Sequence, residues 1–381
     1  PHTQIISLTI TEKGYCTDIE GQLDFTIPDL KHDAELLSRP DGPLGGGVRL
    51  KTSLGMLTMG LHNRQSHAPS DPVTLLSCDN LPSNGAELKR LLLDFISQTK
   101  PQLLDYVEHQ VSFPNSMVDR ITPGVTDESV ALFQEETGIA DPWPIIAEDF
   151  SQWVVEDDFI AGRPAWDSVE GNNILFVQDC EPYEHMKLRL LNASHTAMAY
   201  LSILAGHTKV NESMRRENVF QYVKSYMDMA TATVPHVQGV CVEEYKNTLQ
   251  SRFCNLSDDL SRLAQDGSKK MVGFVLPSLK IQLASGNSTE QIASVVASWI
   301  YYLHCMPNEV DDPRRDELLH LSKAVMDGSP AAMQEFVKRT LGEDIESESN
   351  FIREIEIYLK ILESQSADAV LNAFMNTKTA T

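Results

Sequence analysis

A lysine, an asparagine and a histidine stand close together in the stretch from Glu184 to His195. These residue types can remove a proton from a hydroxyl group and hold the oxygen that loses it. Burial disfavours the ammonium form of a lysine, so a buried lysine can accept a proton near neutral pH. We therefore predict that Lys187 is a general base and that Asn192 and His195 bind the reacting oxygen. Taken alone, the pattern favours surface residues or satisfied polar groups of a core, so the rest of the chain must decide.

One continuous helix is predicted to carry these residues, because the stretch follows Pro182 and contains no glycine or proline before Gly206. An α-helix turns roughly 100° per residue, so the polar residues fall on one broad face. Leu188 and Leu191 share that face, which predicts that it is buried. The polar residues on this face are Glu184, Lys187, Asn192 and His195.

Two short β-branched runs, residues 5–10 and 73–78, predict buried strands. A helical segment around residues 55–61 lies between them, which is the signature of a parallel sheet. In an open sheet of this kind, ligands bind beyond the carboxyl ends of the strands. The polar residues that follow the two strands are therefore expected on the ligand-binding side: Thr11, Glu12 and Asn80.

The texture of the sequence changes after Cys180, where long amphipathic stretches dominate. Together with the strands, this predicts an α/β plus all-α fold. Residues 1–178 would form a Rossmann-like domain with a partial parallel sheet, and residues 179–381 a mostly α-helical domain. The site helix would open the second domain, in the cleft between the two. The predicted helices of the second domain are residues 219–230, 241–253, 256–265, 277–285, 289–304, 315–326, 330–341 and 350–364.

The formal net charge of −23 argues against nucleic acid and against an anionic membrane surface, because both need a basic face. No apolar run approaches the ~18 residues of a membrane span, and no signal pattern opens the chain. The six cysteines are scattered without a C-x2-C pair, which indicates free thiols in a reducing compartment. We therefore expect a cytoplasmic protein, and a monomer.

Two further motifs look functional but are interpreted as structural. The glycine-rich run Gly42–Gly47 follows a polar stretch without a strand, so it is predicted to be a flexible loop and not a phosphate cradle. Three adjacent carboxylates at residues 156–158 do not share one face of a strand or helix, so a solvated turn is predicted. No metal site is expected.

Several blocks along the chain occur together in one known family. Lys187, Asn192 and His195 form a K-x4-N-x2-H pattern, which resembles that of the polyol-specific long-chain dehydrogenases. This group includes mannitol 2-dehydrogenase, arabinitol dehydrogenase and the fructuronate and altronate reductases. The remaining blocks follow the family's order: residues 7–15, 77–85, 113–123, 153–159, 162–164 and 266–267.

The resemblance implies reversible oxidation of a polyol to a ketose, with NAD or NADP as cofactor, NAD being favoured, and without a metal. It implies that Asn80 stabilises the alkoxide together with Asn192. It places Val118, Asp119, Arg262 and Lys270 at the substrate, and Lys269 stays open as an alternative to Lys270. Glu184, one helical turn before Lys187, is either a proton relay or a charge favoured by the helix N-terminus. Thr11 and Glu12 are expected to contact the cofactor.

Two other functions stay open. The sequence of residues 9–14 slightly favours a hexuronate reductase that acts on fructuronate or tagaturonate. In such an enzyme, Arg262 and Lys270 would pair with the carboxylate of the substrate. The family's N-terminal glycine-rich segment, which cradles the cofactor pyrophosphate, does not precede Ile5 here. The second alternative is therefore a non-catalytic remnant that acts as an interaction module.

Overall fold

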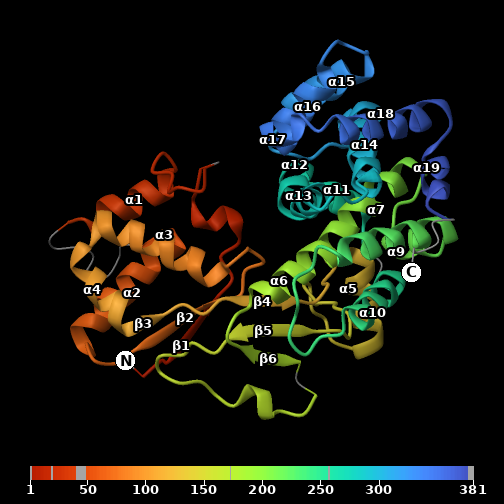
Figure 1. The fold of residues 1–381 in the computed structure, drawn as a ribbon. Helices are drawn as coiled ribbons and strands as arrows, with labels where there is room; N and C mark the ends of the chain where they lie inside the picture. The colour runs from red at the N-terminus through yellow and green to blue at the C-terminus, as the bar shows by residue number, and fades with distance from the viewer. Residues whose placement is uncertain (1, 19, 40–48, 172, 256–257, 376–381) are drawn as a thin grey trace. The chain divides into compact units, whose positions relative to one another are not determined.

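A computed structural model describes residues 2–18, 20–39, 49–171, 173–255 and 258–375. The chain forms two compact units. In Figure 1 the colour of the ribbon follows the sequence, from red at the N-terminus to blue at the C-terminus. Unit 1 consists of Pro1–Arg120 and Ser151–Glu184, and unit 2 of Ile121–Phe150 and His185–Thr381. The domain boundary after residue 178 stays a prediction. The glycine-rich run Gly42–Gly47 lies outside the described residues.

Unit 1 contains a parallel three-stranded sheet in the order β1-β2-β3, as the sequence predicted. Every residue of β2 is buried, and all of its residues except Ser77 are apolar or β-branched, as expected of a strand that is covered on both faces. Helices follow β1 and β2 along the chain and pack beside the sheet in Figure 1. The elements are β1 (Ile5–Leu8), α1 (Pro28–Leu37), α2 (Ser53–His67), β2 (Val73–Ser77), α3 (Asn84–Thr99), α4 (Leu104–Gln110) and β3 (Val111–Ser112).

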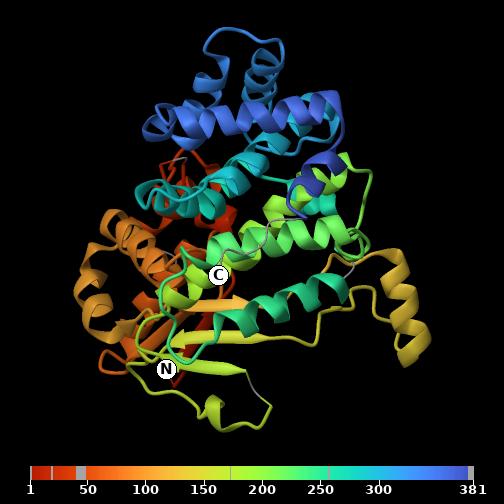
Figure 2. The same ribbon diagram turned by 45° about the vertical axis from the view of Figure 1, so that its right-hand side comes forward.

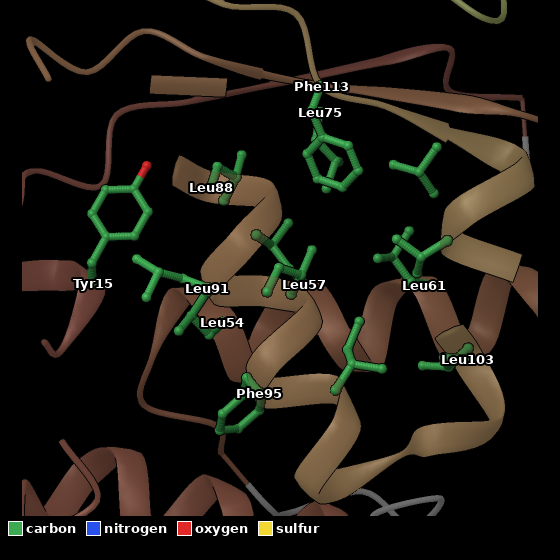
Figure 3. Close-up of a cluster of buried hydrophobic side chains, with 14 of the residues drawn as sticks. Tyr15, Leu54, Leu57, Leu61, Leu75, Leu88, Leu91, Phe95, Leu103 and Phe113 are labelled. Atoms are coloured by element: carbon green, nitrogen blue, oxygen red, sulfur yellow. The ribbon is translucent and has the colours of Figure 1, made fainter. Parts of the chain in front are cut away.

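The core of unit 1 lies between this sheet and helices α2 and α3. Figure 3 shows Leu54, Leu57 and Leu61 of α2 facing the apolar stripe of α3, with Leu75 of β2 above them. The leucine spacing of three and four residues puts all of them on one helix face. Fully burying each such side chain contributes about 1.5–3 kcal/mol. This core holds the carboxyl ends of β1 and β2 in place.

A second sheet in unit 1 joins segments from two parts of the chain. Strand β4 (Ser116–Asp119) pairs antiparallel with β5 (Gln152–Glu156), and β5 pairs in parallel with β6 (Ile174–Val177). The prediction of a solvated turn at residues 156–158 was wrong for Glu156. It ends β5, is half-buried, and accepts hydrogen bonds from Asn115 and from the backbone N–H of Cys180.

Unit 2 is predominantly helical, with α14 at its centre. Most residues of α14 are buried, and α18 packs along it, as the long blue helix in Figure 2 shows. The predicted helices are present, although the one expected at 256–265 is shorter. Helix α6 (Glu181–Lys187) begins in unit 1 and ends in unit 2. The other helices of unit 2 are α5 (Asp127–Thr137), α7 (Ala193–Leu204), α8 (Val210–Met214), α9 (Glu217–Thr231), α10 (Val242–Asn255), α11 (Leu260–Ala264), α12 (Gly267–Lys270), α13 (Leu276–Ala284), α14 (Glu290–Cys305), α15 (Arg315–Met326), α16 (Ala332–Leu341), α17 (Glu343–Glu346), α18 (Ser349–Ser364) and α19 (Ala367–Ala373).

The fold therefore combines a Rossmann-like parallel sheet with a mostly helical second part, as predicted. Among the residues that the structure describes, no helix has the length and apolar character that crossing a membrane requires.

Candidate functional site

The helix that carries the predicted base is not one continuous α-helix. Helix α6 ends at Lys187, residues Leu188–Asn192 form a π-helical segment (η4), and α7 begins at Ala193. The N–H of Ala193 donates to the carbonyl of Leu188, five residues earlier. In such a widened turn, residues five apart come towards the same side. Asn192 therefore lies closer to the side of Lys187 than the α-helical rotation predicted, and the prediction of a regular helix was wrong at this point.

The predicted face is buried at Lys187 and His195 and half-buried at Glu184 and Asn192. Lys187 is 6% exposed and His195 is 9% exposed. The side-chain oxygen of Asn192 is shielded from solvent and has no hydrogen-bond partner among the described residues. Leaving a buried acceptor unsatisfied costs roughly 1–3 kcal/mol, so this atom is suited to a polar ligand. The site thus holds an amine, an amide and an imidazole in an apolar setting.

His195 is held as a neutral imidazole. Its ring stacks on Phe253 with the ring centroids 4.1 Å apart. Burial, reinforced by the positive charges of Arg252 and Lys270, lowers the pKa of His195 to about 3. A neutral imidazole can orient a hydroxyl group through hydrogen bonds, but it carries no extra proton to donate at physiological pH.

Arg252 beside this ring is fixed by an ion pair that the sequence did not reveal. Its guanidinium donates to both carboxylate oxygens of Glu148, at 2.9 and 2.8 Å, and lies 4.0 Å from the ring centroid of Phe150. Glu148 also accepts the N–H of Ile121 at 2.7 Å. The pair joins residues 104 positions apart, so no local sequence signal could have indicated it. The ion pair connects the segment 121–150 to α10, the helix whose Phe253 stacks on His195.

A second π-helical segment, η5 (Met271–Val275), follows Lys270 directly and contacts η4. The amine of Lys270 donates to the carbonyls of Arg262 and Leu263, at 3.3 and 2.9 Å. Arg262 itself is largely exposed, 3.8 Å from Asp258. The amine of Lys270 therefore lies against the backbone of Arg262, the other predicted substrate-binding cation, and it braces the carbonyl groups of α11.

The remaining predicted residues belong to unit 1. Thr11 and Asn80 are exposed beyond the carboxyl ends of β1 and β2. Val118 is half-buried and Asp119 is buried at the end of β4. Their convergence with Lys187 stays a prediction. Glu12 begins a 3₁₀ turn, η1 (Glu12–Tyr15), and its side chain lies outside the described part of the structure.

Glu184 has a visible structural role. Its carboxylate accepts the backbone N–H of Ser83 at 3.1 Å. Ser83 precedes α3 in a left-handed conformation with φ of 46°, so the carboxylate supports a turn that a non-glycine residue rarely adopts. This contact adds a third reading to the two that the sequence left open, and the role of Glu184 as a proton relay stays a prediction.

Metal ligands do not cluster in the described ranges: no group of three or more histidine, cysteine, aspartate or glutamate side chains could hold a metal ion there.

Comparison with known proteins places the chain. Residues 2–168 match the model for the mannitol dehydrogenase Rossmann domain, and residues 179–363 match that for the mannitol dehydrogenase C-terminal domain. The chain is 35% identical to mannitol 2-dehydrogenase of Phaeosphaeria nodorum, over 97% of this chain and 64% of that protein. It is similar to the solved Pseudomonas fluorescens mannitol 2-dehydrogenase ternary complex with NAD and D-mannitol, with 36% identity, a TM-score of 0.80, and coverage of 98% of this chain and 75% of that chain.

A second solved structure, D-sorbitol dehydrogenase in substrate-free form, has a TM-score of 0.83 at 28% identity, and the match covers 97% of this chain and 74% of that one. The chain thus spans between 64% and 75% of the length of these three proteins. Two family models together cover nearly all of its residues in the expected order. The chain belongs to the mannitol dehydrogenase family.

Proposed function

We propose that this chain belongs to an oxidoreductase that interconverts a polyol of the mannitol or arabinitol type and the corresponding ketose, with a nicotinamide cofactor. The observation that carries the proposal is the buried amine of Lys187 at the junction of α6 and η4, with Asn192 and His195 on the following turns. Its relatives support it, because one of them has been solved with NAD and D-mannitol bound.

Lys187 is the proposed general base. Oxidation removes the hydroxyl proton and a hydride from the adjacent carbon, and the neutral amine of Lys187 would take the proton. General acid–base catalysis of this kind contributes roughly 10²–10⁴-fold to a rate. His195 would orient the reacting hydroxyl as a neutral hydrogen-bonding partner, because its pKa is lowered to about 3.

Two carboxamides would stabilise the alkoxide. The side-chain N–H groups of Asn192 and Asn80 would donate to the oxygen as negative charge develops, which is the physics of an oxyanion hole. The side-chain oxygen of Asn192, which has no hydrogen-bond partner in the part of the chain that the structure describes, is then available to accept from a neighbouring hydroxyl of the polyol. Because such donors can stabilise the alkoxide without a metal ion, we propose that the reaction is metal-independent.

The nicotinamide cofactor, which accepts or returns the hydride, fits the carboxyl edge of the sheet in unit 1. Strands β1 and β2 are parallel, and the exposed polar residues Thr11 and Asn80 follow their carboxyl ends, where open sheets of this class bind nucleotides. Thr11 and Glu12 are the proposed cofactor contacts. NAD is favoured over NADP.

Val118 of β4 would line the substrate pocket, and the substrate hydroxyls would be bound by Asp119 of β4 and by Arg262 and Lys270. The exposed guanidinium of Arg262 could also bind a substrate carboxylate, so hexuronate reduction is the second candidate function. The third candidate is a non-catalytic interaction module.

Steady-state kinetics of the full-length gene product test the proposal. Mannitol, arabinitol and fructuronate are offered in turn with NAD, NADP and their reduced forms, and nicotinamide absorbance reports hydride transfer. We expect turnover of a neutral polyol with NAD that survives extensive chelation of metals. Preference for fructuronate would favour the reductase, and absence of turnover and of nucleotide binding would favour the interaction module.

A further inference from the structure

Asp79, directly before the proposed catalytic residue Asn80, is a buried carboxylate with an unusual set of partners. It is 3% exposed. One carboxylate oxygen accepts the backbone N–H of Thr11 at 2.7 Å, and the other accepts the hydroxyls of Tyr15 at 2.7 Å and Ser77 at 3.1 Å. Asp79 thereby joins the residues that follow β1 to the end of β2.

The backbone of Thr11 is strained. Its φ of 67° and ψ of 160° fall in a region that is essentially restricted to glycine. A β-branched side chain makes this conformation particularly unfavourable. Residues of this kind persist only where their surroundings hold them, and they gather at functional sites. The carboxylate of Asp79 supplies such a hold, because it binds the N–H of the strained residue itself.

The other partner, Tyr15, reinforces the same turn. The turn η1 brings Tyr15 back under the sheet, and Figure 3 shows its ring at the edge of the apolar core with the hydroxyl pointing towards the strands. Burial raises the pKa of the Tyr15 phenol, so it remains a proton donor to Asp79 at all physiological pH values. The amide of Asn84 donates to the carbonyl of Asp79 at 2.9 Å, which fixes the backbone leading into Asn80.

We propose that Asp79 is a positioning residue that sets the backbone of Thr11 for the cofactor and the side chain of Asn80 for the reacting oxygen. The inference rests on the proposed function, because it assigns a role within that site. Two groups that must act on one reaction thus share one anchor, and a small displacement of either lowers the rate.

The test compares Asp79→Asn with the matched control Asp33→Asn in the full-length protein. Asp33 is an equally buried carboxylate of unit 1, but it accepts from the backbone of Lys51 and from Thr52. Both variants are expected to lower the melting temperature. Only Asp79→Asn should raise the KM for the nucleotide and lower kcat, by roughly tenfold to a hundredfold in kcat/KM. Equal kinetic effects of the two variants would overturn the proposal.

A second variant separates the hold on Thr11 from general damage. Glycine adopts the observed backbone angles without strain, so in a Thr11→Gly background the further loss in kcat/KM caused by Asp79→Asn should shrink severalfold. An undiminished loss would contradict the proposed hold.

Titration with NADH, followed by its fluorescence, distinguishes a failure of this inference from a failure of the proposed function. Should the wild-type protein oxidise no polyol but bind NADH, weaker binding by Asp79→Asn would support the positioning role and unchanged binding would overturn it. A wild-type protein that binds no NADH would remove both proposals.

Discussion

The two π-helical segments of unit 2 have the same layout but different causes. Each begins directly after a lysine, η4 after Lys187 and η5 after Lys270, and the two segments contact each other. Pro277 explains the widening of η5, because a proline lacks an N–H and its ring would clash with the carbonyl of Gly273 in a regular α-helix. Widening the preceding turn relieves that clash.

No proline or glycine lies in or just after η4, so local chain chemistry does not account for its widening. Segments of this type occur frequently at functional sites. The side chains of the two segments also differ. The residues of η5 are apolar and expose Val272, whereas η4 ends in Asn192, whose side-chain oxygen is unpartnered among the described residues. We infer that η5 accommodates a proline, and that η4 positions chemical groups.

Replacing the two lysines gives the largest expected contrast. Lys187→Ala should lower kcat by about 10²–10⁴-fold, because it removes the proposed general base. Lys270→Ala should act mainly on KM and on stability, because its amine binds the carbonyls of Arg262 and Leu263. Kinetics and thermal unfolding of both variants measure this. Equal losses of kcat would break the distinction between the two segments.

Removing the widening itself gives a smaller effect. Deleting the half-buried Leu188 should convert η4 to α-helix, in which Lys187 and Asn192 would stand four residues apart and still share one face, so the loss of kcat should stay below about tenfold. The helix content in circular dichroism should be unchanged.

Deleting Val272 from η5 is the matched control. It should lower the melting temperature more than the Leu188 deletion does, because the clash of Pro277 returns. A Leu188 deletion that folds but loses as much kcat as Lys187→Ala would show that the widened turn itself, and not only the shared helix face, positions these groups.

The smallest expected effect concerns His195, a titratable group for which η5 has no counterpart. Its folded-state pKa of about 3 lies below its ordinary value of 6.5, so the unfolded chain binds a proton that the folded chain does not. Its contribution to stability is therefore complete above pH 6.5 and declines by about 1.4 kcal/mol per pH unit as the pH falls towards 3.

Urea unfolding between pH 6.5 and 4.5 measures this slope. His195→Gln should show a shallower fall than the wild type, whereas His320→Gln, at an exposed position of α15, should follow the wild type. Parallel curves for the wild type and His195→Gln would contradict the burial of a neutral imidazole.

The sequence predicted elements whose cause is local. The strands around residues 5–8 and 73–77 and the helices of unit 2 follow from hydrophobic periodicity, and the burial of Lys187 followed from its leucine neighbours. It could not predict η4, because residues 188–192 read as ordinary helix formers.

Long-range features were equally hidden. The ion pair of Arg252 with Glu148 and the hold of Asp79 on Thr11 depend on tertiary packing. The strain at Thr11 even contradicts the local preference of threonine, so only the fold can impose it. Such conflicts between local preference and structure are expected where function is located.

Chemical rescue of Lys187→Ala tests the central claim most directly, namely that an amine at residue 187 takes the hydroxyl proton. Small primary amines of graded basicity are added to the variant in the presence of polyol and NAD. We predict that kcat rises with the concentration of neutral amine and with its basicity. A variant that folds and binds NADH but responds to none of the amines, or one that turns over at the wild-type rate without them, would contradict the account.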